Sequence, residues 1–194
     1  MLTGAPGTGK TTLRRALVQR IADIEGFDYG ELLLRRKTRQ GIELRYEDMR
    51  EQSASVISSA DVVATDDMVV GEVSRLRSAS HIIIDSHALT REAYGFRAVP
   101  FSLAHLRDLR LDAVVFLRCD PEALINRVEA DPGGRRNLTV ELAREIQLLQ
   151  ESLSLVYAVA CACPFHAIDT THLTVEEVLR LAVGILTKLG ITPE

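Results

Sequence analysis

Residues 4–11 read Gly4-Ala5-Pro6-Gly7-Thr8-Gly9-Lys10-Thr11, and this stretch decides the fold. It fills every fixed position of the pattern G-x-x-x-x-G-K-[ST], and its glycine order differs from the dinucleotide-binding G-x-G-x-x-G. Glycines let the backbone turn tightly, so that successive N–H groups point at phosphate oxygens near the positive end of the following helix. A chance glycine-rich turn explains the stretch poorly, because apolar residues recur directly after it at helical spacing. These residues are Leu13, Ala16, Leu17, Ile21 and Ile24.

The polar side chains of this phosphate-binding loop (P-loop) have expected partners. Lys10 is expected to reach the β and γ phosphates of a nucleotide. The Thr11 hydroxyl is expected to bind Mg²⁺, a hard ion that takes few protein ligands and keeps several waters. Thr12 and Arg127 are expected to contact the same nucleotide. The predicted ATP-binding residues are Gly4, Ala5, Pro6, Gly7, Thr8, Gly9, Lys10, Thr11, Thr12 and Arg127.

The start of the chain is short for this motif. Only Met1, Leu2 and Thr3 precede the loop, whereas strands normally run about five residues. We therefore expect either a shortened central strand or a natural start further upstream.

The stretch His81-Ile82-Ile83-Ile84-Asp85 is an apolar run that ends in an acid. Such a run predicts a parallel strand buried on both faces, with a carboxylate at its carboxyl end. Aspartates at strand ends can be simple turn formers. Because the P-loop requires a metal partner, we predict that Asp85 binds Mg²⁺ or its waters, together with Thr11.

Further strands and helices alternate along the chain. Strands are predicted at Ala113–Leu117 and Phe165–Ile168. Asp120-Pro121 is typical of a helix start, and Thr174 with Glu177 forms a capping box before a final helix. The alternation predicts an α/β fold of the three-layer P-loop NTPase type, with a mostly parallel sheet of about five strands, helices on both faces and a short lid.

Composition limits the class of protein. The 194 residues are 46% hydrophobic, which suits a single kinase-type domain over 1–194, and the net charge of −4 makes nucleic acid an improbable partner. The apolar runs are too short to cross a membrane, and there is no signal-peptide pattern, so a cytoplasmic location is expected. The cysteines, Cys119, Cys161 and Cys163, are expected to be reduced thiols that pack in the core.

The stretch at about 131–138 reads Asp131-Pro132-Gly133-Gly134-Arg135-Arg136-Asn137 and then Leu138. Its turn residues predict a small mobile lid, whose closure would bring Arg135 and Arg136 onto the transferred phosphate. A long helix is predicted from near Thr139. The apolar stripe predicted to face the core there is Leu142, Ile146, Leu149, Leu153 and Val156.

Together these motifs resemble the archaeal-type adenylate kinases, which are short P-loop nucleoside monophosphate kinases. The resemblance covers nearly the whole chain. It rests on residues 4–11, Gly30 after the second strand, Met49-Arg50, Asp85-Ser86-His87, Tyr94-Gly95-Phe96 before Pro100, and Arg135-Arg136.

The resemblance implies transfer of the ATP γ-phosphoryl group to AMP with Mg²⁺, giving two ADP. It implies catalytic roles for Lys10, Asp85, Arg135 and Arg136, and an acceptor region at about 28–75 and 86–100. The acceptor-binding residues that it implies are Gly30, Arg50, His87, Arg91 and Arg97.

Some residues near that region have a simpler interpretation. His87 could equally be a local hydrogen-bonding residue. Arg35, Arg36 and Lys37 are most simply an exposed basic face. The family also commonly places an arginine in the helix after the lid, where this chain has Glu151 and Ser152.

Two other functions stay open from the sequence. One is a kinase for another nucleoside monophosphate or for a metabolite hydroxyl, with Asp85 as the base. The other is a nucleotide-dependent assembly factor or switch that hydrolyses ATP slowly while it binds a protein or ribosomal partner. The absence of an Asn-Lys-x-Asp motif disfavours a GTPase.

Overall fold

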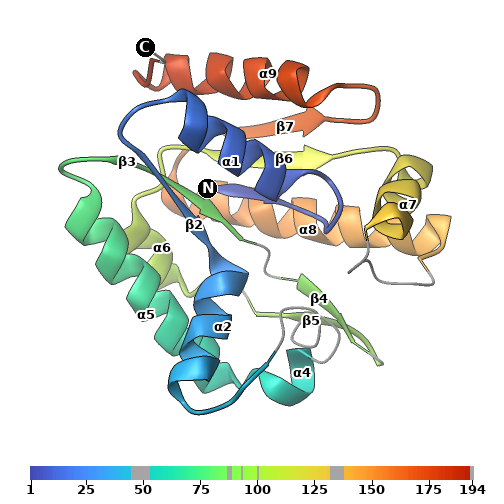
Figure 1. Ribbon diagram of the computed structural model, residues 1–194, viewed down its shortest axis with the longest axis horizontal. Helices are drawn as coiled ribbons and strands as arrows, with labels where there is room; N and C mark the ends of the chain where they lie inside the picture. The colour runs from blue at the N-terminus through green and yellow to red at the C-terminus, as the bar shows by residue number, and fades with distance from the viewer. Residues whose placement is uncertain (45–52, 87–88, 93, 100, 132–137, 193–194) are drawn as a thin grey trace.

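A computed structural model describes residues 1–44, 53–86, 89–92, 94–99, 101–131 and 138–192. Its main sheet has five parallel strands in the order β2-β3-β1-β6-β7 (Figure 1). The strands are β1 (Leu2–Gly4), β2 (Ile24–Asp28), β3 (His81–Asp85), β6 (Val114–Arg118) and β7 (Phe165–Asp169). The parallel sheet predicted from the alternating pattern is therefore confirmed.

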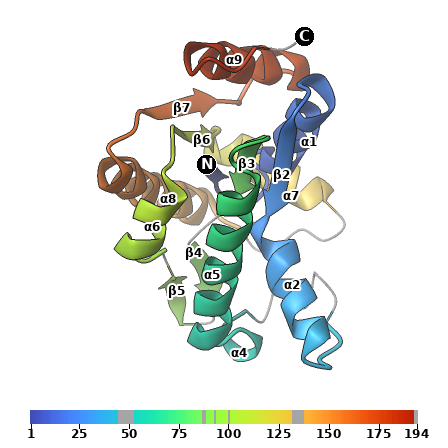
Figure 2. The ribbon, with the colours of Figure 1, turned by 90° about the vertical axis from the view of Figure 1, so that its left-hand side faces the viewer.

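Helices cover both faces of this sheet. The helices of the described residues are α1 (Lys10–Arg20), α2 (Tyr29–Arg39), α4 (Ser53–Val56), α5 (Ser59–Leu76), α6 (Leu103–Leu109), α7 (Pro121–Ala130), α8 (Val140–Cys161) and α9 (Val175–Lys188). Helices α1 and α9 lie together on one face, and α5, α6 and α8 lie on the other (Figures 1 and 2). Each face has its own buried cluster, one around Leu17 and Leu179 and one around Val69 and Leu106.

Local sequence signals position several of these elements. Asp120 caps α7 and Pro121 stands at its first turn, as predicted. The Thr174 capping box is complete. The Thr174 side chain accepts from the Glu177 N–H, and the Glu177 side chain accepts from the Thr174 N–H. The helical pattern after the P-loop was predicted to continue to Ile24, which is wrong. Helix α1 stops at Arg20, and Ile24 begins β2, because Asp23 adopts positive φ and turns the chain.

The central strand β1 is indeed short. It pairs with β6 at three positions, from Leu2 with Val115 to Gly4 with Leu117, but with β3 only between Leu2 and Asp85. The Met1 amine donates to the Ala113 carbonyl oxygen at 2.7 Å. The amine therefore takes part in the sheet at the opposite end of the strand from the P-loop.

A second group of elements lies beyond the carboxyl ends of the strands (Figure 1). It contains α2, α4 and a two-stranded antiparallel sheet of β4 (Leu89–Glu92) and β5 (Gly95–Ala98). Buried polar pairs join α2 to α5, with Lys37 Nζ 2.6 Å from Asp61 and the Tyr29 hydroxyl 2.5 Å from Asp66.

The predicted exposed basic face on α2 is wrong for one of its three residues. Arg35 is exposed and Arg36 is half-buried, but Lys37 is buried. Burial alone would raise the pKa of Asp61, yet hydrogen bonds from Lys37 and Ser58 hold that pKa well below its usual range. The Lys37–Asp61 pair is therefore an internal ionic contact between helices that are 24 residues apart at this point.

The predicted core stripe of α8 is also only partly correct. Leu142, Ile146 and Leu153 are half-buried, but Leu149 and Val156 are exposed. The side of α8 that faces the sheet carries small and polar residues instead: Ala143, Gln147, Gln150, Ser154, Tyr157 and Ala158. Among the described residues, no helix is long and apolar enough to cross a membrane.

Candidate active site

The P-loop connects the carboxyl end of β1 to α1, in a conformation that only glycine fits at two points. Gly4 has a φ of +144°, and a Cβ there would lie 2.4 Å from the Leu117 carbonyl oxygen. Gly7 has a φ of +87°, and its Cβ would lie 2.8 Å from Val128 Cγ2. The neighbouring strand and α7 therefore hold the loop in a shape that a side chain at either position would disrupt.

Lys10 folds back over this loop. Its Nζ donates to the carbonyl oxygens of Gly4 at 2.8 Å and Ala5 at 3.1 Å, and the residue is buried. A buried ammonium needs such acceptors. The amine therefore lies inside the turn whose N–H groups are predicted to bind phosphate.

Asp85 ends β3 beside the first turn of α1. The Thr11 hydroxyl donates to Asp85 Oδ2 at 3.2 Å. Burial raises the pKa of Asp85, and the Lys10 and Arg14 charges partly oppose that shift. The two residues predicted as metal ligands, 74 positions apart in sequence, are thus in direct contact.

Sequence reasoning missed Arg14. Its Nε lies 3.7 Å from Asp85 Oδ2, and its Nη2 lies 3.3 Å from Asp28 Oδ2. Asp28 and Asp85 are register partners on β2 and β3, so Arg14 contacts two neighbouring buried carboxylates. Its spacing from Lys10 puts both cations on one face of α1, and this i, i+4 spacing was the available signal.

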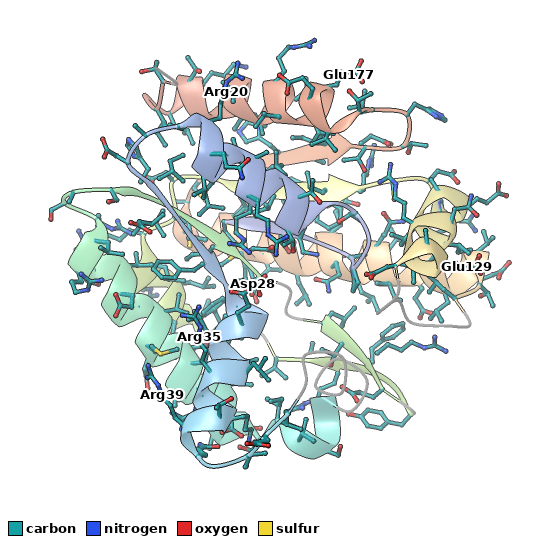
Figure 3. All side chains as sticks on the ribbon, in the orientation of Figure 1. Arg20, Asp28, Arg35, Arg39, Glu129 and Glu177 are labelled. Atoms are coloured by element: carbon teal, nitrogen blue, oxygen red, sulfur yellow. The ribbon has the colours of Figure 1, made fainter. Side chains whose placement is uncertain are left out.

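Asp28 also links the site to the second group of elements. Its Oδ1 accepts a hydrogen bond from the Glu31 N–H at 3.1 Å, which caps α2. Figure 3 shows Asp28 where β2 passes into α2. The capped helix therefore starts beside the carboxylate that is predicted to bind metal.

The donor set suits Mg²⁺ better than a metal held by protein alone. Mg²⁺ usually takes one or two carboxylates and relies on substrate phosphates and waters for the rest. Thr11 and Asp85 supply a hydroxyl and a carboxylate oxygen at the P-loop. Within the described ranges, no cluster of three or more histidine, cysteine or acidic side chains forms a protein-only metal site.

A cavity of about 410 Å³ opens beside the loop. Its walls come from the P-loop and the start of α1 on one side and from the β7–α9 connection on the other. Arg127 of α7 is held against the second wall, because its Nη1 donates to Thr170 Oγ1 at 2.8 Å and its Nη2 to the Thr170 carbonyl at 2.6 Å. Leu13 and Leu173 add apolar surface. This combination suits a flat heteroaromatic group attached to the bound phosphates.

The predicted acceptor residues fall on the second group of elements. Gly30 lies in the first turn of α2, Arg91 on β4 and Arg97 on β5. Arg97 donates to the Ile57 carbonyl at 3.1 Å, which connects β5 to the α4–α5 junction. The roles of these three residues stay predictions.

Four further predicted residues, Arg50, His87, Arg135 and Arg136, lie outside the described residues, as do residues 132–137 of the lid predicted at 131–138. The loop residues are all described. Thr8 is buried, and its hydroxyl donates a hydrogen bond to the Ala5 carbonyl oxygen. Thr12 is exposed and lines the 410 Å³ cavity. Pro6 is half-buried and Gly9 adopts the left-handed conformation just before α1.

A family profile described as "AAA domain" matches residues 3–146, which is well over half of the chain. The chain belongs to this family. The part of the chain that the profile matches starts one residue before the P-loop. It includes Asp85, Arg127 and most of the elements that form the site.

Relatives with closely similar lengths carry the name adenylate kinase. The protein of that name from Methanoculleus marisnigri is 23% identical over 192 residues, covering 96% of both chains. That of Pyrobaculum aerophilum is 27% identical, covering 84% of this chain and 77% of the relative. A Methanothermobacter thermautotrophicus protein named adenylate kinase homolog is also 27% identical, over 165 residues.

Among solved structures, a shikimate kinase from Acinetobacter baumannii in complex with shikimate superposes with a TM-score of 0.56. The alignment covers 98% of this chain and 93% of that one at 15% identity, so the likeness shows the fold. The chain thus has the P-loop kinase fold, is an ATP-dependent phosphotransferase of the adenylate kinase-like type, and resembles archaeal adenylate kinases at low identity.

Proposed function

We propose that this protein is a nucleoside monophosphate kinase that transfers the γ-phosphoryl group of ATP to AMP, with Mg²⁺. The observation that carries the proposal is the contact of Thr11 with Asp85 at 3.2 Å, directly beside the buried Lys10 amine. The full-length similarity to proteins named adenylate kinase supports AMP as the acceptor.

The donor nucleotide is proposed to bind across the P-loop. Its base and ribose would occupy the 410 Å³ cavity beside Leu13 and Leu173. Lys10 would exchange the Gly4 and Ala5 carbonyl oxygens for phosphate oxygens. The exchange suits a cation that neutralises charge as the phosphoryl group transfers, since catalysis here consists of positioning and electrostatics.

Mg²⁺, held through Thr11 and Asp85, would neutralise phosphate charge. The Thr11 hydroxyl and the Asp85 carboxylate are already oriented by their mutual hydrogen bond. Arg14 holds Asp85 from the other side. A phosphate acceptor is itself a competent nucleophile, so the chain needs no general base for this reaction.

The acceptor nucleotide is proposed to bind on the group formed by α2, α4, β4 and β5, at residues 28–75 and 86–100. Gly30 lies in the first turn of α2, which Asp28 caps beside the proposed donor site. Arg50, His87, Arg91 and Arg97 are the proposed acceptor contacts. Arg135 and Arg136, on the proposed lid at 131–138 of this single domain, would add cations and exclude water.

A second candidate is a kinase for a small hydroxyl compound. The observation that favours it is the adjacent pair of buried carboxylates, Asp28 and Asp85, with the raised pKa of Asp85. A carboxylate with a raised pKa is better suited to accept a proton from a hydroxyl acceptor. However, Asp28 already accepts bonds from Arg14 and from the Glu31 N–H, which leaves Asp85 as the candidate base.

The test is ADP formation from ATP and Mg²⁺ with AMP, CMP, UMP, GMP or shikimate added singly, and without any acceptor. The proposal predicts that AMP gives the fastest ADP formation and that Lys10→Ala abolishes it. If shikimate is the best acceptor, the hydroxyl-kinase function replaces it. Equal ADP formation without any acceptor would instead identify an ATPase or switch.

A further inference from the structure

The two faces of α8 have an inverted distribution of polarity. The residues that face the sheet include Gln147, Gln150 and Ser154, all buried. The residues that face solvent include five large apolar side chains with exposed fractions between 37% and 74%. These are Leu148 at 57%, Leu149 at 37%, Leu155 at 49%, Val156 at 54% and Val159 at 74%. We call them, with Ser152, the outer stripe.

The buried polar residues explain why the apolar side chains are outside. Gln147 Oε1 accepts from the Cys119 N–H at 2.9 Å, and Gln150 Nε2 donates to the Leu89 carbonyl at 3.1 Å. Ser154 donates to the Gln150 carbonyl at 2.7 Å. The inner face therefore carries side chains that satisfy backbone groups after β6, on β4 and within α8 itself. Figure 2 shows α8 at the margin of the molecule.

Contiguous apolar surface of this kind is unusual on a monomer and marks interaction sites. From Leu148 to Val159, the exposed positions carry only leucine, valine and Ser152, and the charged Glu151 is half-buried at their edge. Positions 148, 152, 155 and 159 follow the alternating four- and three-residue steps of a coiled-coil seam. A stripe without charge can face its own copy without like-charge repulsion.

We propose that the outer stripe binds a second copy of this chain, with the two α8 helices antiparallel about a two-fold axis. In that arrangement Leu148 faces Val159 of the second copy, and Ser152 faces Leu155 of the second copy. Both pairings use the same axis, so the contact is self-complementary, as a closed dimer requires. The small Ser152 side chain lets the helices approach closely near the axis.

The exposed area fits the apolar centre of such a dimer. A fully buried leucine or valine side chain corresponds to roughly 100 Å² of apolar area at about 25 cal/mol per Å². Five side chains that are about half exposed would then bury roughly 500 Å² over two copies. Standard interfaces bury about 1,600 Å² in total, with an apolar centre and a polar rim. Polar residues at the ends of the stripe, such as Arg144 and Glu145, would form part of the rim.

Sedimentation equilibrium of the whole chain, from about 1 to 200 µM, tests the proposal. The dimer should dissociate in this range. Leu155→Glu and Val156→Glu should each raise the dimer Kd at least about thirtyfold, the size of a typical hot-spot loss. Ser152→Leu should raise the Kd by roughly tenfold, because the larger side chain separates the helices near the axis.

Val63→Glu is the matched control. Val63 lies on α5 and is 53% exposed, close to the 54% of Val156, so it adds the same charge at the same exposure elsewhere. The control should leave the Kd unchanged. A monomer at every concentration, a trimer or larger ring, or a dimer insensitive to the α8 variants would overturn the proposal. Circular dichroism checks that each variant keeps its helices.

Discussion

The proposed donor side, formed by the P-loop and α1, and the proposed acceptor side, formed by α2, α4, β4 and β5, are held together in different ways. On the donor side, the P-loop lies within the central sheet, where the Leu117 carbonyl and Val128 leave no space for a side chain at Gly4 or Gly7. On the acceptor side, buried polar pairs connect separate helices, as in Lys37 with Asp61. Close packing therefore restricts the P-loop, whereas buried ionic and hydrogen-bonded contacts between helices, with a small apolar cluster around Ile57 and Val62, hold the acceptor side.

This difference has a functional consequence. A kinase must hold ATP phosphates in one geometry, whatever its acceptor. Acceptor specificity can change when elements such as α2 and the β4–β5 sheet shift, without any change in the P-loop. The proteins named adenylate kinase have sequences similar to this chain, and the shikimate kinase has the same fold. Both similarities agree with a conserved donor side and a variable acceptor side.

The largest effect is expected on the donor side. Lys10→Met should lower the rate of ADP formation by about a thousandfold, because a cation on the transferred phosphoryl group is lost. Thermal stability should change little in comparison. Arg15→Met is the control, since Arg15 is an exposed cation on the same helix. A Lys10→Met rate within tenfold of the parent would contradict the role of this amine.

The next effect concerns the acceptor side. Lys37→Met should lower the free energy of unfolding by about 3 kcal/mol, because Asp61 would lose its closest cation in a buried position. The KM for ATP should stay close to that of the parent. Urea unfolding measures the first quantity and initial rates the second. Arg35→Met, on the exposed side of the same helix (Figure 3), should change neither.

The central sheet and the α2–α5 contact should also respond to pH in different ranges. In a chain that begins at Met1, burial lowers the pKa of the Met1 amine to about 6 from 8.0. The unfolded chain therefore binds more protons between these values, and the free energy of unfolding should rise from pH 6 to pH 8 by about 2 kcal/mol. N-terminal acetylation should remove this rise.

The Asp61 contribution also makes the free energy of unfolding rise with pH, but in an acid range. Its pKa is lowered in the folded chain, so its stabilising effect is complete above the unfolded value and is lost as the pH falls below about 4. Lys37→Met should reduce this acid sensitivity and leave the change between pH 6 and 8 intact. If a single variant altered both ranges, the two regions would not be independent.

The smallest effect is expected at Arg14, where the two sides meet. Arg14→Met should raise the Mg²⁺ concentration for half-maximal rate by about tenfold, since a group that orients a metal ligand is lost. Arg14→Lys should restore part of the loss. Gly26→Ala offers an independent test, because its Cβ would lie 3.2 Å from Arg14 Cγ and 3.3 Å from Nη1. An unchanged Mg²⁺ requirement in all three variants would exclude the role.

The predictable part of the structure follows from local signals. The loop, the strand ending at Asp85 and the caps at Asp120 and Thr174 each depend on a few adjacent residues, and their places in the fold were confirmed. The catalytic and binding roles assigned to them stay predictions. The Thr11–Asp85 contact was also predictable, because carboxyl ends of parallel strands meet at one edge of the sheet.

The remaining features depend on contacts between distant residues. Lys37 looks like a solvent-exposed cation until its position opposite Asp61 is known. Arg14 looks the same until Gly26 is found to leave space for it. On α8, apolar residues occur on more than one face, so periodicity cannot show that Gln147 and Gln150 face inward to bind backbone groups.

The most direct measurement of the proposed activity follows the γ-phosphoryl group of ATP to AMP. ATP labelled with ³²P in its γ-phosphoryl group is incubated with the protein, Mg²⁺ and AMP, and the products are separated. If the protein phosphorylates AMP, the label should appear in the β position of ADP. CMP, UMP and GMP should accept less of it, and Lys10→Met should transfer almost none. Label released as inorganic phosphate at the same rate with and without AMP would contradict the proposed kinase activity.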